Sequence, residues 1–71
     1  MKKGTQEVHF EKVGSRTIYV FIEEDCFDVY YQKKGYPLMF AYGLPLETID
    51  GITDVFEIAW ANFEEYEEMF D

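Results

Sequence analysis

The sequence predicts an α+β domain in which a four-stranded antiparallel meander is followed by one C-terminal helix (ββββα). Residues 7–43 contain four short runs rich in β-branched and aromatic residues, with two-residue breaks between them. Residues 48–70 then carry apolar side chains at spacings of three, four or seven, which is the period of one helix face. A chain of 71 residues has room for one domain and one core.

The expected strands span residues 7–13, 16–23, 26–33 and 36–43. Short connections at Glu24-Asp25 and Lys34-Gly35 imply antiparallel hairpins. If both are two-residue turns, nine apolar residues gather on one face, which is the expected core: Ile18, Val20, Ile22, Phe27, Val29, Tyr31, Leu38, Phe40 and Tyr42. Pro37 has no N–H to donate and therefore suits an edge strand.

Two registers are open for the first hairpin. A two-residue turn at Gly14-Ser15 would place Val8 and Phe10 on the face opposite the core. A three-residue loop would place them on the core face instead. We favour the longer loop, because it turns His9 and Glu11 outward.

The sheet face opposite the core is then unusually aromatic. It holds His9, Glu11, Tyr19, Phe21, Cys26, Asp28, Tyr30, Met39 and Ala41. A single helix covers only one face of a sheet, and Tyr, Phe and Met are enriched in interface cores. Tyr19, Phe21, Tyr30 and Met39 are therefore candidate contacts of a homodimer or another partner. The alternative is ordinary strand composition, half covered by neighbouring long side chains.

The expected helix, residues 48–70, begins near Thr48 or Asp50, either of which can cap it. Its apolar stripe contains Ile49, Ile52, Val55, Phe56, Ala59, Trp60, Phe63, Tyr66 and Phe70. Residues 49–70 would span about 33 Å at about 1.5 Å per residue, which exceeds the length of the sheet. The end of the helix is therefore expected to overhang.

Charge is divided unevenly between the two halves of the chain. The net charge is −9, and residues 35–71 hold nine acids and no base, whereas residues 1–34 are neutral. A helix C-terminus disfavours acids, and like charges four residues apart repel, yet no base in this half relieves either effect. The predicted partner-binding face is acidic and contains Asp54, Glu57, Ile58, Glu64, Glu65, Glu67, Glu68 and Asp71.

The spacing of these acids is close to that of nucleic-acid phosphates. From Asp50 to Asp71, eight acids would lie along about 32 Å of helix, against about one phosphate per 3.4 Å of a DNA strand. Such a face can occupy a groove built for nucleic acid. A frayed, solvated tail is the competing interpretation of the same run.

Residue types argue against several functional classes. The chain has one His, one Ser and one Cys (His9, Ser15 and Cys26), and no catalytic, metal-binding or phosphate-loop motif, so we expect no enzyme, no metal site and no cofactor. Direct binding to nucleic acid or to an anionic membrane needs clustered Lys or Arg. A lone cysteine, no secretory signal and no long apolar run predict a soluble cytoplasmic protein.

In size, acidity and lack of catalytic motifs, the chain resembles phage-encoded anti-restriction, anti-CRISPR and DNA-mimic proteins. The resemblance is one of composition and assigns no residue. It implies an inhibitor or decoy whose acidic helix blocks a basic partner, such as a nucleic-acid-binding enzyme. The alternative is a homodimerising interaction module, joined through its aromatic sheet face, in which the acids serve solubility.

Overall fold

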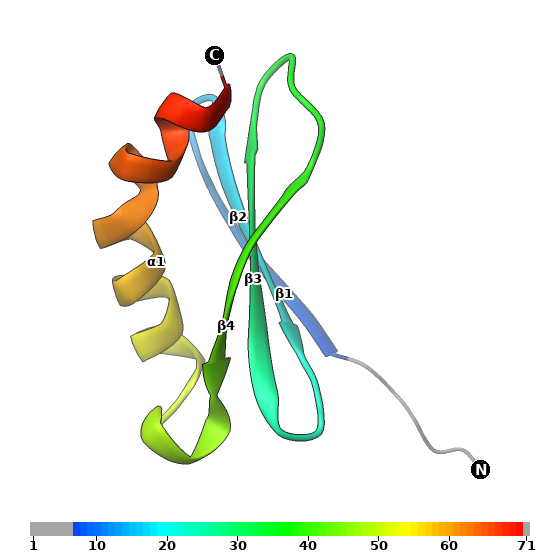
Figure 1. Ribbon diagram of the computed structural model, residues 1–71, viewed down its shortest axis with the longest axis vertical. Coiled ribbons are helices and arrows are strands. Elements are labelled where there is room, and N and C mark those ends of the chain that lie inside the picture. Colours follow the sequence, from blue (N-terminus) through cyan, green and yellow to red (C-terminus); the bar gives the residue numbers. More distant parts are fainter. Residues whose placement is uncertain (1–6, 71) are drawn as a thin grey trace, which may run out of the picture.

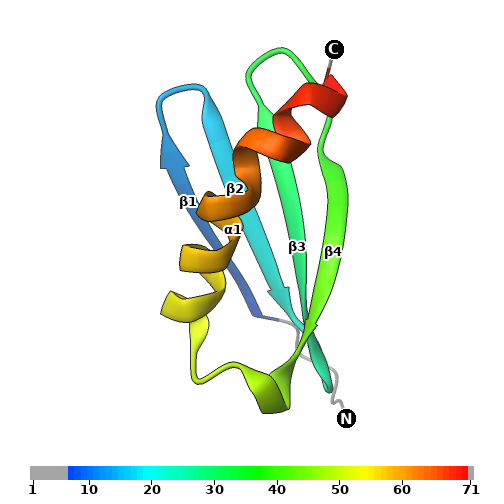
Figure 2. The same cartoon turned by 60° about the vertical axis from the view of Figure 1, so that its left-hand side comes forward.

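The computed structural model describes residues 7–70, which form one sheet and one main helix. The strands β1 (Glu7–Val13), β2 (Arg16–Ile22), β3 (Cys26–Lys33) and β4 (Met39–Pro45) are antiparallel and lie in the order β1-β2-β3-β4. A 3-10 turn, Leu46–Thr48, precedes α1 (Ile52–Glu67), and a second one, Glu68–Phe70, follows it. α1 packs on one face of the sheet, and no described element covers the other (Figures 1 and 2). The predicted ββββα order is confirmed.

The core lies between β2, β3 and α1. β2 and β3 pair in the predicted register, with Ile18 opposite Tyr31 and Val20 opposite Val29. Side chains alternate across a strand, so these four residues all point toward the helix, where none has any exposed surface. Burying each large apolar side chain contributes about 1.5–3 kcal/mol. The buried residues are Ile18, Val20, Phe27, Val29, Tyr31, Val55, Phe56, Ala59, Phe63 and Phe70.

The first hairpin adopts the register that we did not favour. Val13 pairs with Arg16 across a two-residue turn, in which Gly14 has a φ of 63°. Glycine tolerates this left-handed conformation, which is what a tight hairpin turn requires. Val8 and Phe10 therefore lie on the outer face, and His9 and Glu11 lie on the helix side. The prediction failed because an inward position on an edge strand need not be apolar.

The predicted position and register of β4 are also wrong. The turn at Lys34-Gly35 forms, but the strand begins at Met39, and an irregularity follows, so that Phe40 faces Tyr30 and Tyr42 faces Val29. Tyr42 packs against the core as expected, whereas Met39 and Leu44 take the places of Leu38 and Phe40, which are 44% and 53% exposed. Pro37 lacks the N–H that would extend the ladder, and one extra residue reverses the faces of a strand.

The helix is shorter than predicted, and its end is packed. Gly51 occupies the N-cap position without a side-chain hydrogen bond, so neither predicted residue caps the helix. The Thr48 hydroxyl instead donates to the Pro45 carbonyl oxygen over 3.0 Å, within the 3-10 turn. At the other end, Phe70 is buried, with its ring centroid 5.3 Å from that of Tyr36. The expected overhang is therefore wrong for the described residues.

Candidate binding surfaces

One side of α1 is acidic and points away from the sheet. Glu57, Glu64, Glu65 and Glu68 are exposed and Asp54 is half-exposed. At about 100° per residue, the four on α1 and Glu68 at its C-cap fall within an arc of about 100°, opposite the buried stripe. We call these five residues the acidic helix face. Residues 52–67 contain no base, so this side of the helix carries charge of one sign.

Glu67, which we predicted to be part of this face, turns toward the sheet instead. Arg16 donates from Nε and Nη2 to the two Glu67 carboxylate oxygens over 3.0 and 2.7 Å, and the Lys33 Nζ atom lies 3.4 Å away. The Glu67 side chain is only 18% exposed. The hydrogen bond from Arg16, with help from Lys33, holds the pKa of Glu67 below its ordinary value of 4.5, although partial burial opposes this. Glu67 therefore joins helix to sheet and is not available to a partner.

Arg16 and Lys33 also offset the unfavourable negative charge at the C-terminal end of the helix. No base is within reach of the helix end along the chain, but β2 and β3 place Arg16 and Lys33 beside the last turn of α1. The Arg16 guanidinium also lies 5.3 Å from the centroid of the Phe63 ring. Positive charge at a helix C-terminus is favourable, so the sheet supplies the cations that the helix lacks. The expectation that nothing offsets the C-terminal acids is wrong.

The acidic face is shorter than predicted, but its charges are spaced about as expected. The acidic helix face extends from Asp54 to Glu68, about 21 Å at about 1.5 Å per residue, so its five acids amount to about one charge per 4 Å. It divides into an N-terminal pair and a C-terminal group of three. Between them lie Ile58, which is half-buried, and Ala61, which is exposed. Asp71 lies outside the described residues.

The uncovered face of the sheet carries a row of aromatic side chains that crosses all four strands. Strand pairing places Phe10 beside Tyr19, Tyr19 beside Tyr30, and Tyr30 beside Phe40. We call these four residues the aromatic row. The ring centroids are 5.8 Å apart in the first pair and 5.2 Å apart in the last. Phe10 is 63% exposed, so the end of the row lies open to solvent.

Three of the four predicted contact residues lie on this outer face. Tyr19, Phe21 and Tyr30 are half-buried there, and the Phe21 ring is 5.0 Å from that of Tyr30. Met39 is on the other face, opposite Tyr31, and packs against the core. We missed Phe10 and Phe40, which are among the most exposed apolar residues. The two-residue register of the first hairpin, had we favoured it, would have identified Phe10.

The single histidine and cysteine lie in different environments. The His9 Nε2 atom is 3.6 Å from a carboxylate oxygen of Glu7. The Cys26 thiol lies 3.4 Å from the Asp28 Oδ1 atom, and desolvation together with this carboxylate raises the pKa of Cys26 to about 11. A thiol with so high a pKa stays protonated at neutral pH and is a poor nucleophile. Within residues 7–70, no three His, Cys, Asp or Glu side chains are grouped to hold a metal ion.

No protein-family model, curated protein or solved structure matches the chain. Within residues 7–70, α1 is too short and too polar to cross a membrane. Functional inference therefore depends on the two surfaces described above, the acidic helix face and the aromatic row.

Proposed function

We propose that the protein is a small non-enzymatic binding protein that blocks a basic partner, a nucleic-acid-binding enzyme, through its acidic helix face. The observation that carries this proposal is the placement of five carboxylates on one arc of a helix that has no base. A surface of one sign attracts an oppositely charged groove, speeds association and excludes acidic partners. This mode of action is that of phage-type anti-restriction, anti-CRISPR and DNA-mimic proteins.

The way the helix is held supports this proposal. Glu67 is bound by Arg16 and Lys33, and Phe70 is buried, so both contacts fix the C-terminal turns on the sheet. The neighbouring acids are then presented at fixed positions. Binding through a preorganised surface loses less conformational entropy than binding through a frayed tail. The tail interpretation is therefore the weaker one.

The gap between the two acidic groups suits a protein partner. Ile58 and Ala61 lie in it, with acids on either side along the helix. Interfaces combine a small apolar centre with a polar rim, and salt weakens the rim more than the centre. Binding should therefore weaken with added salt, because part of the attraction depends on released counterions.

The test uses two variants with the same net charge. The first removes four acids of the helix face, by changing Glu57, Glu64, Glu65 and Glu68 to Gln. The second removes four exposed acids elsewhere, by changing Glu7, Glu24 and Glu47 to Gln and Asp25 to Asn. Wild type and both variants are immobilised, and the proteins that they retain from host lysate are identified at low and high salt.

The proposal predicts that wild type and the second variant retain the same basic nucleic-acid-binding protein, that high salt releases it, and that the first variant does not retain it. Equal retention by both variants would contradict the proposal. Equal loss from both would also contradict it, because net charge would then matter and the helix face would not.

A second candidate function is homodimerisation through the outer face, and the aromatic row favours it. Contiguous exposed apolar surface commonly marks an interface, and aromatic residues dominate interface cores. Side chains of the outer face form three cross-strand rows, and the aromatic row is the middle one. The candidate occupant is a second copy of the chain, because a two-fold axis along the middle row would stack that row on the same row of the second copy.

The flanking rows are complementary in that arrangement. Gln32 lies on one side of the aromatic row and Asp28 on the other, both on β3, so the axis would bring Gln32 of one copy to Asp28 of the second. The two Asp28 carboxylates would stay apart. The acidic helices would lie on the two outer sides of the dimer, which limits repulsion between them. The two proposals are therefore compatible.

A further inference from the structure

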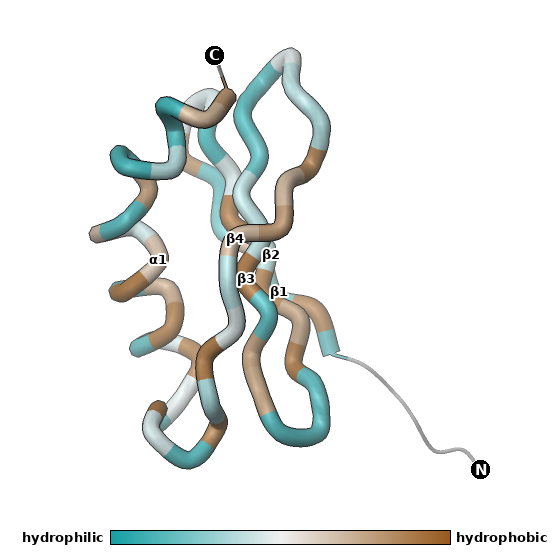
Figure 3. The backbone as a smooth tube through the Cα atoms, in the orientation of Figure 1, coloured by the Kyte–Doolittle hydropathy of each residue, from teal (hydrophilic) through white to brown (hydrophobic). Residues whose placement is uncertain are grey.

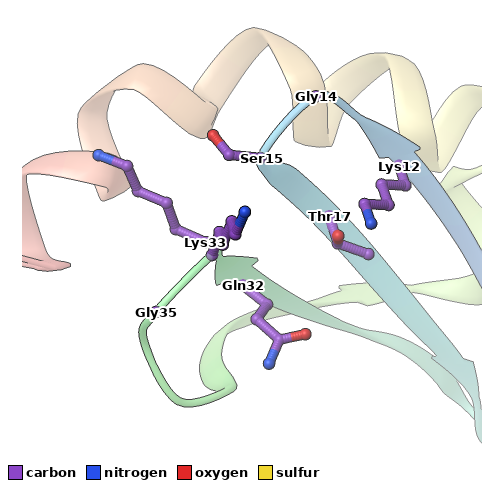
Figure 4. Close-up of a pocket in the computed structure, with 8 residues that line it drawn as sticks. Lys12, Gly14, Ser15, Thr17, Gln32, Lys33 and Gly35 are labelled. Carbon is purple, nitrogen blue, oxygen red and sulfur yellow. The ribbon is translucent and has the colours of Figure 1, made fainter.

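A hollow lies at the end of the sheet where two hairpin turns meet (Figure 4). It has a volume of about 460 Å³, within the range of small-ligand sites. The turns at Gly14-Ser15 and Lys34-Gly35 border it, and the backbone N–H of Lys34 donates to the Ser15 carbonyl oxygen over 2.8 Å. The two turns are therefore tied together, which fixes the shape of the hollow.

The lining is basic in an otherwise acidic protein. Lys12, Lys33 and Lys34 line the hollow, and no carboxylate does. The Lys33 Nζ atom is paired with Glu67 at 3.4 Å, whereas Lys12 and Lys34 are exposed and have no ion pair with a described residue. Two ammonium groups are thus left for a ligand.

Neutral hydrogen-bonding groups accompany the two lysines. Strand pairing places Lys12 beside Thr17 and Thr17 beside Gln32, in one row across three strands on the outer face. The Ser15 side chain comes from the adjoining turn (Figure 4). Two hydroxyls, one amide and two ammonium groups are the donors that phosphate oxygens accept from.

The charge of the helix does not cancel this local field. The acidic helix face is on the side of α1 turned away from the sheet, so the width of the helix, about 10–12 Å, lies between these carboxylates and the end of the sheet that bears the hollow. The Debye length at physiological ionic strength is about 8 Å. An anion at the hollow is therefore governed by Lys12 and Lys34 more than by the net charge.

We infer that this hollow binds the phosphate group of a small phosphomonoester, with Lys12 and Lys34 as its charge partners. The aromatic row adjoins the hollow. Each of its first three members lies two residues along its strand from a residue that lines the hollow: Phe10 from Lys12, Tyr19 from Thr17 and Tyr30 from Gln32. The organic part of the ligand would lie over these rings, so it would compete with the homodimer proposed above for the same surface. A nucleoside monophosphate, which has a dianionic phosphate and a planar base, has this chemistry.

The test is a titration of ¹⁵N-labelled protein at constant ionic strength, with inorganic phosphate and with a nucleoside monophosphate as separate probes. Both should shift the amide signals of the two turns, and the nucleotide should bind more tightly and also shift the amide signals of Phe10 and Tyr19.

Replacing Lys12 and Lys34 by Gln should raise the Kd of each probe by about tenfold or more, since each substitution removes a charge-assisted hydrogen bond. The matched control replaces Thr53 and Ala61, both exposed on α1, by Glu. It lowers the net charge equally and should change the Kd by no more than about twofold.

Three results would overturn the inference. One is an absence of localised shifts with either probe. Another is equal loss of affinity in the lysine variant and its control, which would assign binding to net charge. The third comes from a separate titration with oligothymidylate: its binding when neither small probe binds would indicate a nucleic-acid surface. The spectrum of each variant reports whether it is folded, and none of these results bears on the acidic helix face.

Discussion

The two faces of the sheet are similar in composition but different in what they do. In β2, the inward residues Ile18 and Val20 are fully buried, whereas the outward residues Tyr19 and Phe21 remain partly exposed. The difference lies in α1, which covers one face only (Figure 1). Hydropathy alone would not separate the two faces, since both carry hydrophobic residues: Ile18 and Val20 on the covered face, Phe21 and Phe40 on the open one. Figure 3 shows hydrophobic and hydrophilic residues interspersed along the backbone. The covered face therefore provides the buried core, and the outward residues of the open face keep part of their surface exposed.

The largest contrast in stability should come from removing one phenylalanine from each face. Phe63 is 1% exposed and its ring lies 4.8 Å from that of Tyr31. Phe63→Ala should lower the free energy of unfolding by about 3–5 kcal/mol, because it leaves a cavity. Phe10→Ala, on the open face, should lower it by about 0.5–1 kcal/mol. Urea unfolding followed by circular dichroism measures both. If Phe63→Ala does not fold, Phe63→Leu provides a milder change, and equal losses at the two sites would contradict the comparison.

Dimerisation should depend on the open face, in contrast to stability, which depends mainly on the covered face. Replacing Phe10 and Phe40 by Ser removes both exposed ends of the aromatic row, and should weaken the dimer by about tenfold or more. The matched control replaces Val13 and Met69, which are exposed but outside the row, by Ser. Sedimentation equilibrium measures the dimer dissociation constant. A monomeric wild type, or equal weakening by the control, would remove the dimer proposal.

Tyrosine hydroxyls on the two faces should also differ in how much they contribute to the free energy of unfolding. The Tyr31 hydroxyl donates to the Ala59 carbonyl oxygen over 2.9 Å and lies 2.7 Å from the Tyr42 hydroxyl, joining sheet to helix. Tyr31→Phe should cost about 1 kcal/mol of unfolding free energy. Tyr30→Phe, whose hydroxyl has no hydrogen-bond partner among the described residues, should be nearly neutral. Thermal unfolding of both variants tests this, and a greater loss for Tyr30→Phe would be the contrary result.

The smallest expected effect concerns the two kinds of acid on the helix. The folded-state pKa of Glu67 is lowered, so its contribution to stability is present above the ordinary value of 4.5 and is lost as pH falls through the lowered value. Glu67→Gln should therefore lower Tm near neutral pH and flatten its dependence on pH below about 4.5. Glu64→Gln, on the acidic helix face, should leave the profile of wild type unchanged in shape. Tm profiles from about pH 3 to 7 test this, and identical profiles for the two variants would contradict the assignment of Glu67.

Local patterns explain which parts of the fold the sequence predicts. The register of β2 and β3 follows from a tight turn between two alternating apolar runs, and it is confirmed. The register of β4 depends on Pro37 and on an irregularity at Phe40–Tyr42, which alternation does not reveal. Glu11 accepts a hydrogen bond from the Trp60 Nε1 atom over 2.7 Å, so an inward acid at a sheet edge can be satisfied.

The candidate sites depend more on contacts between distant residues. The exposed acids of α1 follow from helix period alone, and the sequence predicts them. Glu67 lies 51 residues from Arg16, and no local pattern indicates that they are paired. Likewise, the hollow at the hairpin turns depends on Ser15 and Lys34 meeting across the sheet. Such contacts are set by tertiary structure, so periodicity cannot predict them.

The central claim is that the acidic helix face occupies a site that nucleic acid would otherwise fill. The most direct measurement is competition. The basic partner retained by the wild-type protein is titrated with duplex DNA or RNA, and bound protein is followed by fluorescence anisotropy at fixed salt. The proposal predicts that nucleic acid displaces the protein fully from the partner. The apparent Kd of the protein for the partner should rise linearly with the concentration of nucleic acid. A ternary complex that persists at saturating nucleic acid would contradict it.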